Sequence, residues 1–536
     1  MSARRLGTAL VFLLASSGAL AGNPAVTVAI DATANRHPIN PNIYGVAFAS
    51  KADLAALNAP LNRSGGNAET AYNWTENATN LGQDWYFESY PGDSDVPGAD
   101  ADRFVSDTKS QGAIPMLTTP LAGWVAKLGA GRSILPSFSV TKYGPQCDTD
   151  YWDPDAGDGL KPDCAAPIAG NDPNDAFIAD TPAREQKWIR HLVKSWGKSR
   201  AGGVPYYLMD NEPSIWFSTH RDMRPIGPHA DEYRDKVIAM SAKIKAVDPD
   251  AKIVAPEEWG WEAYFYSGYD QQYAAEHGYC CWPDHDGMQG GMDYIPWLLS
   301  EWKKAGHPVD VLSVHYYPQS GEDSDDVSQD MQLLRNESTR ELWDPDYKSK
   351  SWINDKVYLI PRLKRWIADG YYADTPVAIT EYNWGAEGHI NGATTQADIF
   401  GIFGREGLDM ATRWTVPDKS TPTYKAMQMY RNYDGAGSGF GDTSVAAQVP
   451  DPDDLSAFAA LRADGTLTVM VIAKTLTADT PVKLKLAHFS KAGTAQVWRL
   501  DSGNRIQRLS DIAWSGRTLS DTAPAQSITL YVLPRS

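Results

Sequence analysis

Two glutamates stand in short polar motifs, each next to an apolar run that is typical of a buried strand. Glu212 lies in Asp-Asn-Glu-Pro (210–213) after the run 206–209, and Glu381 lies in Thr-Glu-Tyr-Asn-Trp (380–384). A carboxylate at the end of a buried strand is unfavourable unless it is paired, so each glutamate is expected to have a partner or a function there. Glycoside hydrolysis uses two facing carboxyl groups, one to protonate the leaving oxygen and one to attack the anomeric carbon or activate water. For Glu212 alone, a helix cap is the alternative.

The elements that must position these glutamates are eight short apolar runs separated by longer mixed segments, several of them helical in pattern. Near-continuous apolar runs are typical of strands buried on both faces of a parallel sheet. The pattern predicts an α/β fold built on a TIM-like (β/α)8 barrel. The two glutamates follow the fourth and seventh runs, which would place them across the barrel mouth. The runs are 43–49, 61–65, 114–119, 206–209, 252–255, 309–315, 377–380 and 410–415.

The pattern of apolar and polar residues changes towards the C-terminal end, where short segments of alternating apolar and polar residues lie between turn-forming Gly, Asp and Ser residues. This alternation predicts an additional all-β sandwich domain. The segment 26–30 has the same character, so we expect residues 22–40 to contribute a strand to the sandwich. The expected domains are the catalytic barrel over residues 41–430 and the sandwich over residues 431–536.

The first 21 residues have a basic start, an apolar run and the small-residue ending Ala19-Leu20-Ala21. This layout predicts a signal peptide cleaved near Ala21, and hence secretion to the extracellular space or the periplasm. No other apolar run reaches the roughly 18 residues that span a bilayer, so we expect no membrane association. The 67 acidic and 49 basic residues give a net charge of −18, which repels phosphate backbones and argues against nucleic acid. We expect a monomer.

Several motifs together resemble glycoside hydrolase family 44, whose members are exported β-1,4-glucanases and xyloglucanases with a barrel and a β-sandwich. They are DNEPSIW, STHRD, ITEYNWG, GWVAK and RSGGNAETAYNWTENATNLGQDWYF. The resemblance covers nearly the whole mature chain. It implies a retaining, endo-acting enzyme that cleaves cellulose derivatives, xyloglucan or mixed-linkage glucan, with Glu212 as acid/base and Glu381 as nucleophile and without a catalytic cofactor. The alternative is a secreted carbohydrate-binding protein that kept the groove and lost the chemistry; the presence of both glutamates favours the enzyme.

Other residues near the strand ends are expected to bind substrate or to tune the carboxylates. Asn211 would donate its amide to a sugar 2-hydroxyl as charge develops in the transition state. Arg63, at the end of the second run, needs an acidic partner if it is buried, and we expect it to hold Glu381 ionised. His220 and His315 would tune the carboxylates by hydrogen bonding, with a purely structural role as the alternative. Aromatic rings suit the C–H-rich faces of pyranoses, and the candidate platforms are Trp74, Trp85, Trp124, Tyr317 and Trp384. Tyr382 is also expected at the substrate site, as a polar neighbour that keeps Glu381 charged.

An acidic loop bracketed by two cysteines, "CDTDYWDPDAGDGLKPDC", is a candidate metal site. Closely spaced carboxylates with bending glycines suit Ca²⁺, and the family resemblance also implies structural calcium. We expect Asp153 and Asp155 to take part; a solvated acidic turn is the alternative. The four cysteines allow three pairings, among which the sequence alone does not decide. We favour a disulfide between Cys147 and Cys164, because closing such a loop constrains the unfolded chain.

Two further interpretations, a zinc site and a metal-dependent hydrolase, rest on weaker sequence patterns. Cys280 and Cys281, with Asp284 and His285 nearby, would offer zinc ligands, but paired zinc cysteines are normally separated by at least two residues. A metal-dependent hydrolase built on His220, Asp222 and His229 lacks the helical His-Glu-x-x-His arrangement. Neither pattern displaces the two-glutamate hypothesis.

Overall fold

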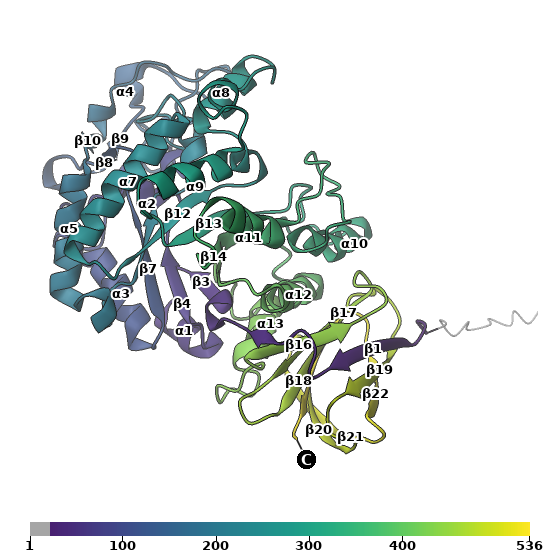
Figure 1. Ribbon diagram of the computed structural model, residues 1–536. Coiled ribbons are helices and arrows are strands. Elements are labelled where there is room, and N and C mark those ends of the chain that lie inside the picture. Colours follow the sequence, from purple (N-terminus) through teal and green to yellow (C-terminus); the bar gives the residue numbers. More distant parts are fainter. Residues whose placement is uncertain (1–21, 536) are drawn as a thin grey trace, which may run out of the picture.

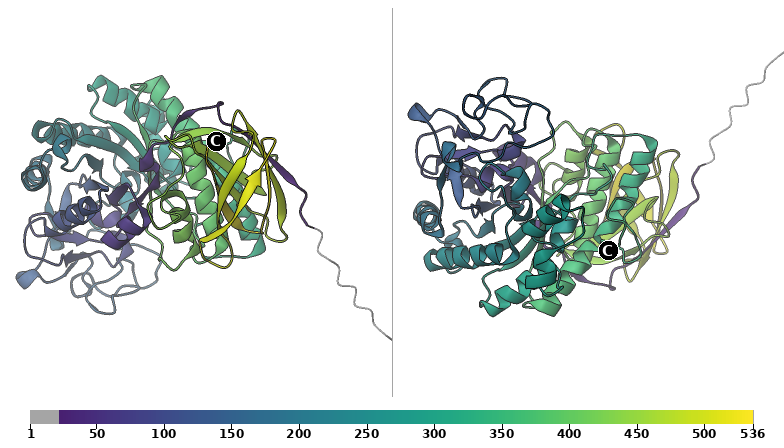
Figure 2. Two further views of the ribbon diagram at one scale, coloured as in Figure 1. Left: turned by 90° about the horizontal axis from the view of Figure 1, so that it is seen from below. Right: turned by 90° about the horizontal axis from the view of Figure 1, so that it is seen from above.

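The computed structural model describes residues 22–535 and contains a closed eight-stranded barrel beside a β-sandwich, as Figures 1 and 2 show. The predicted fold class is therefore confirmed. The predicted signal peptide, with its cleavage near Ala21, lies outside the described residues. Within residues 22–535, the helices are all too short or too polar to cross a membrane.

The barrel consists of eight parallel strands, and each predicted run overlaps one of them, although β12, β13 and β14 extend past the ends of their runs. The ring closes between the first and last strands, because β15 pairs with β3. In order around the barrel the strands are β3 (Gly45–Ala47), β4 (Leu61–Ser64), β7 (Ile114–Thr119), β11 (Tyr206–Met209), β12 (Lys252–Glu258), β13 (Val311–Tyr316), β14 (Val377–Tyr382) and β15 (Met410–Arg413). Side chains such as Leu61, Met116 and Leu208 form a separate apolar cluster drawn from seven of these strands, so the lower barrel is packed with side chains, as in other barrels of this type.

A helix follows each barrel strand and covers the outside of the ring (Figure 1). The α5 helix shows why the sequence folds this way: Thr181 caps its first turn, Pro182 occupies the first position, and Trp188, Ile189 and Leu192 form its buried face. The eight helices are α1 (Lys51–Leu57), α3 (Ala99–Ser110), α5 (Pro182–Trp196), α7 (Ala230–Val247), α9 (Tyr294–Lys304), α11 (Leu359–Gly370), α12 (Ile390–Glu406) and α13 (Pro422–Arg431).

The loops at the carboxyl ends of the strands carry short elements of their own. Two small antiparallel sheets lie in the connections after β4 and β7. They are built from β5 (Ala78–Asn80), β6 (Glu88–Pro91) and β9 (Leu135–Pro136), and from β8 (Trp124–Ala126) and β10 (Phe177–Ala179). The short helices are α2 (Asn67–Thr70), α4 (Val140–Tyr143), α6 (Trp216–Thr219), α8 (Gly268–Glu276) and α10 (Gln329–Ser338).

The β-sandwich combines strands from both ends of the described chain. An N-terminal strand, β1 (Val26–Asp31), pairs antiparallel with β16 and parallel with β19, and the short β2 (His37–Pro38) also pairs with β16. Alternating apolar side chains from both layers meet in one core, as expected for a sandwich. The remaining strands are β16 (Thr443–Gln448), β17 (Leu455–Leu461), β18 (Leu467–Ala473), β19 (Thr480–Ala487), β20 (Gly493–Leu500), β21 (Gln507–Trp514), β22 (Thr518–Ala523) and β23 (Ser527–Leu533).

The α12 helix lies between the barrel and the sandwich and is buried along nearly its whole length. Phe400 and Phe403 belong to the same apolar core as Phe458 and Ile472 of the sandwich. A side chain at Gly401 would overlap the ring of Phe458, so the close contact between the two parts depends on this glycine.

We expect Gly401→Ala to lower the free energy of unfolding by about 1–3 kcal/mol, because the added methyl group overpacks the interface. Gly404→Ala on the same helix is the matched control: its methyl group would lie 3.4 Å from Ile39, and alanine favours a helix over glycine. Urea unfolding of both variants checks this. Equal stability of the two variants would contradict the proposed role of the Gly401 contact.

Candidate active site

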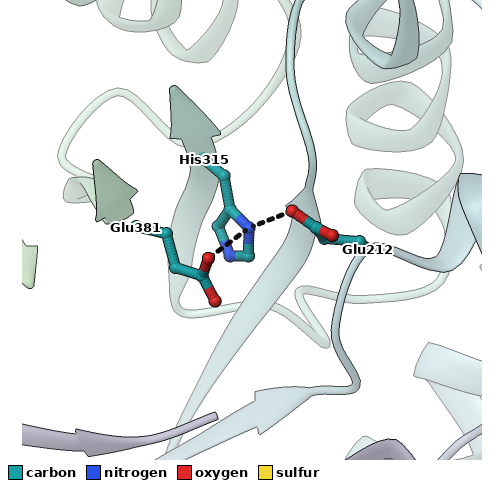
Figure 3. A group of neighbouring side chains, drawn as sticks. All are labelled: Glu212, His315 and Glu381. Atoms are coloured by element: carbon teal, nitrogen blue, oxygen red, sulfur yellow. Dashed lines mark hydrogen bonds and ion pairs between the residues drawn. The ribbon is translucent and has the colours of Figure 1, made fainter. Parts of the chain in front are cut away.

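Three polar side chains converge at the carboxyl ends of β11, β13 and β14, and Figure 3 shows them pointing toward one another. One oxygen of Glu212, one ring nitrogen of His315 and one oxygen of Glu381 all lie within 4.8 Å of one another. His315 Nδ1 lies 2.9 Å from Glu212 Oε1 and 3.6 Å from Glu381 Oε2. The two glutamates predicted from their motifs are thus brought together, with a histidine between them.

A fully buried guanidinium lies beneath this trio. Arg63, the third residue of β4, donates from Nη1 to Glu381 Oε1 at 2.6 Å and from Nη2 to Asn211 Oδ1 at 3.0 Å. Its Nη2 also lies 3.1 Å from Glu257 Oε2. A side chain at Gly65 would overlap the guanidinium, so this glycine leaves the space that Arg63 occupies. The expected contact between Arg63 and Glu381 is present.

Glu257 on β12 is a third buried glutamate of the site, and the sequence analysis missed it. Its Oε2 lies 3.3 Å from His315 Nε2, and its Oε1 accepts from Thr380 Oγ1 at 2.9 Å. The expected strand ended at Ala255, whereas β12 continues through Pro256 to Glu258 with an irregular register at this point. The signal in the sequence was the pair of glutamates that follows the apolar run.

Opposing effects of burial and charge set the protonation of these groups. Burial lowers the pKa of His315, but Glu381, Glu212 and Glu257 outweigh it and raise that pKa to about 10. Burial would raise the pKa of Glu257, but His315 and Arg63 hold it below the usual value. For Glu212 burial prevails over the contact with His315, and its pKa is raised. His315 is therefore a cation at neutral pH, and of the two glutamates that contact its ring nitrogens most closely, Glu212 rather than Glu257 is the one whose raised pKa favours keeping a proton.

Three residues of the site have left-handed backbone conformations that are uncommon for non-glycine residues. The φ angles are +70° for Asp210, +46° for Glu212 and +60° for Glu257. Such conformations are unfavourable by on the order of 1–3 kcal/mol each and are concentrated at functional sites. Asp210 supports the turn, because its carboxylate accepts from Thr70 Oγ1 at 2.6 Å and from the backbone N–H groups of Leu121 and Ala122.

Comparison with known proteins agrees with this geometry. Residues 78–320 match glycoside hydrolase family 44. Over 509 residues the chain is 31% identical to endoglucanase A of Paenibacillus lautus, a match that covers 89% of this chain and 67% of the relative. The chain belongs to glycoside hydrolase family 44. It is also 29% identical to the β-mannanase/endoglucanase A of Caldicellulosiruptor saccharolyticus, but it spans only 36% of that protein's length.

Solved structures extend the comparison. CelM2, described as a bifunctional glucanase-xylanase from a metagenome library, is 56% identical, with a TM-score of 0.94 and coverage of 96% of this chain and all of CelM2. A family 44 xyloglucanase of Paenibacillus polymyxa is 27% identical, with a TM-score of 0.79 and coverage of 96% of this chain and all of the xyloglucanase.

Two further residues expected to bind substrate lie in this family 44 site. The hydroxyl of Tyr317 donates to Glu381 Oε2 at 2.9 Å. Asn211 Oδ1 accepts from Arg63 and from the N–H of Gly66 at 3.1 Å. Its Nδ2 has only a long contact of 3.4 Å with Asn67 Oδ1. The Nδ2 group has two N–H bonds, so one of them remains for a ligand beside the contact with Asn67.

Two aromatic residues expected at the substrate site, Tyr382 and the predicted platform Trp384, are corrected by the structure. Tyr382 is fully buried and accepts from Gln396 Nε2 at 3.1 Å, and Trp384 is buried and donates to Ser338 Oγ at 2.9 Å. Side chains alternate along a strand, so the residue next to Glu381 on β14 faces the outer helices rather than the barrel mouth. These two rings are packing residues and offer no sugar-binding face.

Three other expected site residues lie away from the carboxylates. His220 is buried without a hydrogen-bond partner for either ring nitrogen, and burial lowers its pKa to about 3, so it is a neutral packing residue. The ring of Trp74 packs 6.0 Å from that of His191 on α5. Trp124 is partly buried against the barrel core. Trp85, by contrast, borders a cavity beside Asp84.

Trp414 is an aromatic residue of the site that the sequence analysis missed. It follows β15 directly and is half-buried, with the Arg63 guanidinium 5.8 Å from its ring centre. Gly66, at φ +80°, makes room for it, because a side chain there would overlap the ring. The expected strand 410–415 ran past Trp414 and so hid its position at a strand end.

The two predicted calcium ligands have different surroundings in the structure. Asp155 uses its carboxylate to accept from Ser139 Oγ and from the N–H of Thr141, each at 2.7 Å, so both oxygens are occupied by the neighbouring turn. Asp155 therefore fits a structural cap rather than an ion ligand. Asp153 has one such bond, from the N–H of Asp155.

The four cysteines form two disulfides, Cys147 with Cys164 and Cys280 with Cys281. The second bond removes the thiolates on which a zinc site would depend. Within residues 22–535, Glu212, His315 and Glu381 are the one group of three or more such side chains whose ligand atoms converge closely enough for a metal. Arg63 and protonated His315 already supply positive charge at that point, so the group does not fit a cation.

Proposed function

We propose that this chain is an exported, endo-acting glycoside hydrolase that cleaves β-1,4-glucan backbones with retention of anomeric configuration. The observation that carries the proposal is the approach of Glu212 and Glu381, whose nearest oxygens lie within 4.8 Å. Retaining enzymes hold their carboxyl groups about 5–5.5 Å apart, whereas inverting enzymes need about 6.5–9.5 Å to admit water. The separation favours direct attack by one glutamate.

The charges of the site support different roles for the two glutamates. Glu212, Glu257 and Glu381 face two cations, Arg63 and protonated His315, so the group is neutral when one carboxyl carries a proton. The raised pKa of Glu212 makes it the proton carrier and hence the general acid. Glu381, held by Arg63 and Tyr317, is the ionised nucleophile.

The reaction then proceeds as a double displacement. Glu381 attacks the anomeric carbon as the glycosidic C–O bond breaks, and Glu212 passes its proton to the leaving oxygen. In the second step Glu212 takes a proton from water, whose oxygen attacks the anomeric carbon and releases Glu381. Asn211 Nδ2 would donate to the sugar 2-hydroxyl as charge develops. No catalytic cofactor is needed for either step.

The names of the relatives support the substrate class. They include an endoglucanase, a xyloglucanase and a bifunctional glucanase-xylanase. We infer that soluble cellulose derivatives, xyloglucan and mixed-linkage glucan are substrates of this chain. A carbohydrate-binding protein without activity would bind the same polymers, but it would have no use for a proton-carrying Glu212.

The remaining parts of the proposal concern the chain as a whole. We propose domain limits of 22–40 with 431–536 for the sandwich and 41–430 for the barrel. We also propose a monomer that is exported by its signal peptide and binds neither membranes nor nucleic acid.

Azide rescue tests the two roles separately. In Glu381→Gly the missing carboxylate leaves space for azide, which should restore turnover of an activated aryl β-cellobioside and give the α-glycosyl azide, because one displacement inverts. In Glu212→Ala, azide should attack the glycosyl-enzyme and give the β-glycosyl azide. NMR of the products checks both, and the same anomer from both variants would contradict the assignment.

The pH dependence of activity tests the charge balance. We expect Glu257→Gln to move both limbs of the kcat/KM profile to lower pH by about one unit, because removing one negative charge favours the ionised forms of the remaining carboxyl groups. Glu258→Gln is the matched control. Burial raises the pKa of Glu258 to about 8, so this substitution removes no charge at lower pH. Equal shifts in both variants would contradict the charge argument.

We also infer a structural calcium site, with ligands that differ from the predicted pair. Glu88 is fully buried, and its Oε1 has no hydrogen-bond partner. Burial raises the pKa of Glu88 to about 7, and the nearby Asp150 and Asp153 contribute to the increase. An unpaired buried oxygen near two more carboxylates fits a hard cation. Glu88, Asp150 and Asp153 would hold the ion and tie the acidic loop to β6, although in the described structure their oxygens do not converge as closely as those of Glu212, His315 and Glu381, so they would have to move together around the ion.

Calcium should stabilise the folded protein by about 3 kcal/mol at a hundredfold excess over its dissociation constant, because it binds only the folded state. A chelator should therefore lower the melting temperature, and added calcium should restore it. Glu88→Gln should abolish this response, whereas Asp155→Asn should retain it. Melting curves that do not respond to calcium, together with metal analysis that finds none bound, would contradict the site.

A further inference from the structure

The disulfide-closed loop 147–164 presents two unusually exposed aromatic side chains. Tyr151 is 86% exposed and Trp152 is 76% exposed. Trp152 also faces another aromatic residue across the gap to the β5–β6 connection, because its ring lies 5.8 Å from that of Trp85 at an angle of 31°. Large apolar rings gathered at a surface usually mark a binding site.

The loop holds Trp152 in place before any ligand arrives. Its ends are joined by the disulfide between Cys147 and Cys164. The hydroxyl of Tyr86 donates to Asp148 Oδ2 at 2.9 Å, and the N–H of Trp152 donates to Asp150 Oδ1 at 3.2 Å. A preordered aromatic surface loses little conformational freedom on binding, which favours affinity.

A cavity of about 450 Å³ lies beside these rings. Its lining combines aromatic faces with hydrogen-bonding side chains, among them Gln83, Asp84, Trp85, Tyr86 and Asp158. Flat aromatic faces suit the C–H groups of a pyranose, and carboxylate and amide groups suit its hydroxyls. The lining carries three carboxylates, those of Asp84, Asp148 and Asp158, against the single guanidinium of Arg221, and this excess of negative charge disfavours an acidic sugar and favours a neutral one.

The cavity is connected to the catalytic carboxylates by a continuous series of contacts. Asp84 accepts from Asn67 Nδ2 at 3.1 Å, and Asn67 Oδ1 lies 3.4 Å from Asn211 Nδ2. Asn211 in turn contacts Arg63, which binds Glu381. This series joins Asp84 of the cavity to Glu381, and we expect a polysaccharide chain seated at the carboxylates to extend along this wall towards Trp152.

We propose that Trp152, together with Trp85 and Tyr86, forms a distal subsite that binds a neutral glycosyl residue several units from the scissile bond. The proposal rests on the proposed glucanase function and extends it. Such a subsite favours long chains over short oligosaccharides, because only a long chain reaches both Trp152 and the catalytic glutamates.

Binding without turnover is the first test. In a Glu381→Gln background, affinity electrophoresis in gels containing xyloglucan or hydroxyethyl cellulose should show about threefold to tenfold weaker binding for Trp152→Ala. Trp152→Phe, which keeps an aromatic face, should retain most of the affinity. Tyr372→Ala is the control, since this 38% exposed tyrosine follows α11 and precedes β14, at the opposite end of the barrel.

Kinetics give the second test. Trp152→Ala should raise KM on the polysaccharide about threefold to tenfold and leave kcat/KM on an aryl β-cellobioside unchanged. Trp152→Ala behaving like Tyr372→Ala, or losing activity equally on both substrates, would overturn the subsite while leaving the glucanase function standing. A wild-type protein that turns over no glucan would instead overturn the proposed function, and the subsite with it.

Discussion

The buried guanidinium of Arg63 is the constraint on which the site depends. A fully buried charge without partners is unfavourable by several kcal/mol, so the fold must supply compensating groups from other strands. It does so with Glu381 from β14, Glu257 from β12 and Asn211 from the end of β11. Closure of the barrel is what brings these strand ends to one point, and Gly65 leaves the necessary space. The position of the proposed nucleophile is thus fixed by electrostatics as much as by packing.

This constraint also separates the two glutamates chemically. Glu381 binds a permanent cation at 2.6 Å, whereas Glu212 meets His315 and remains 15% exposed at its side chain. Because Glu257 balances part of the positive charge of Arg63 and His315, the cations do not force all three carboxyl groups to ionise. One carboxyl group can keep its proton, and the environment selects Glu212. The same side-chain chemistry is thereby divided between the proposed acid and the proposed nucleophile.

The sequence predicted the features that depend on local pattern. Apolar runs located all eight barrel strands, and polar motifs at their ends pointed to Glu212, Glu381, Arg63 and Tyr317. The sequence did not predict the features that depend on the direction in which a side chain points in the folded protein. Tyr382 and Trp384 stand beside a site residue in sequence but face the packing side, whereas Trp414 was hidden inside a strand drawn too long.

Glu257 was missed because the predicted run ended at Ala255, before Pro256, whereas β12 continues past this proline into the site. The ligand set of the acidic loop was also beyond the sequence, because Glu88, which has the unpaired oxygen, comes from a distant segment. Contacts between separate segments are not encoded in local spacing.

The central claim is that Glu381, held by Arg63, attacks the anomeric carbon directly, and the configuration of the first product tests it most directly. Proton NMR during hydrolysis of a soluble β-1,4-glucan oligosaccharide by the wild-type protein, recorded before mutarotation, distinguishes the two anomers. Two successive inversions predict that the β-anomer appears first. Initial appearance of the α-anomer would contradict the account and make Glu381 a base that acts through water.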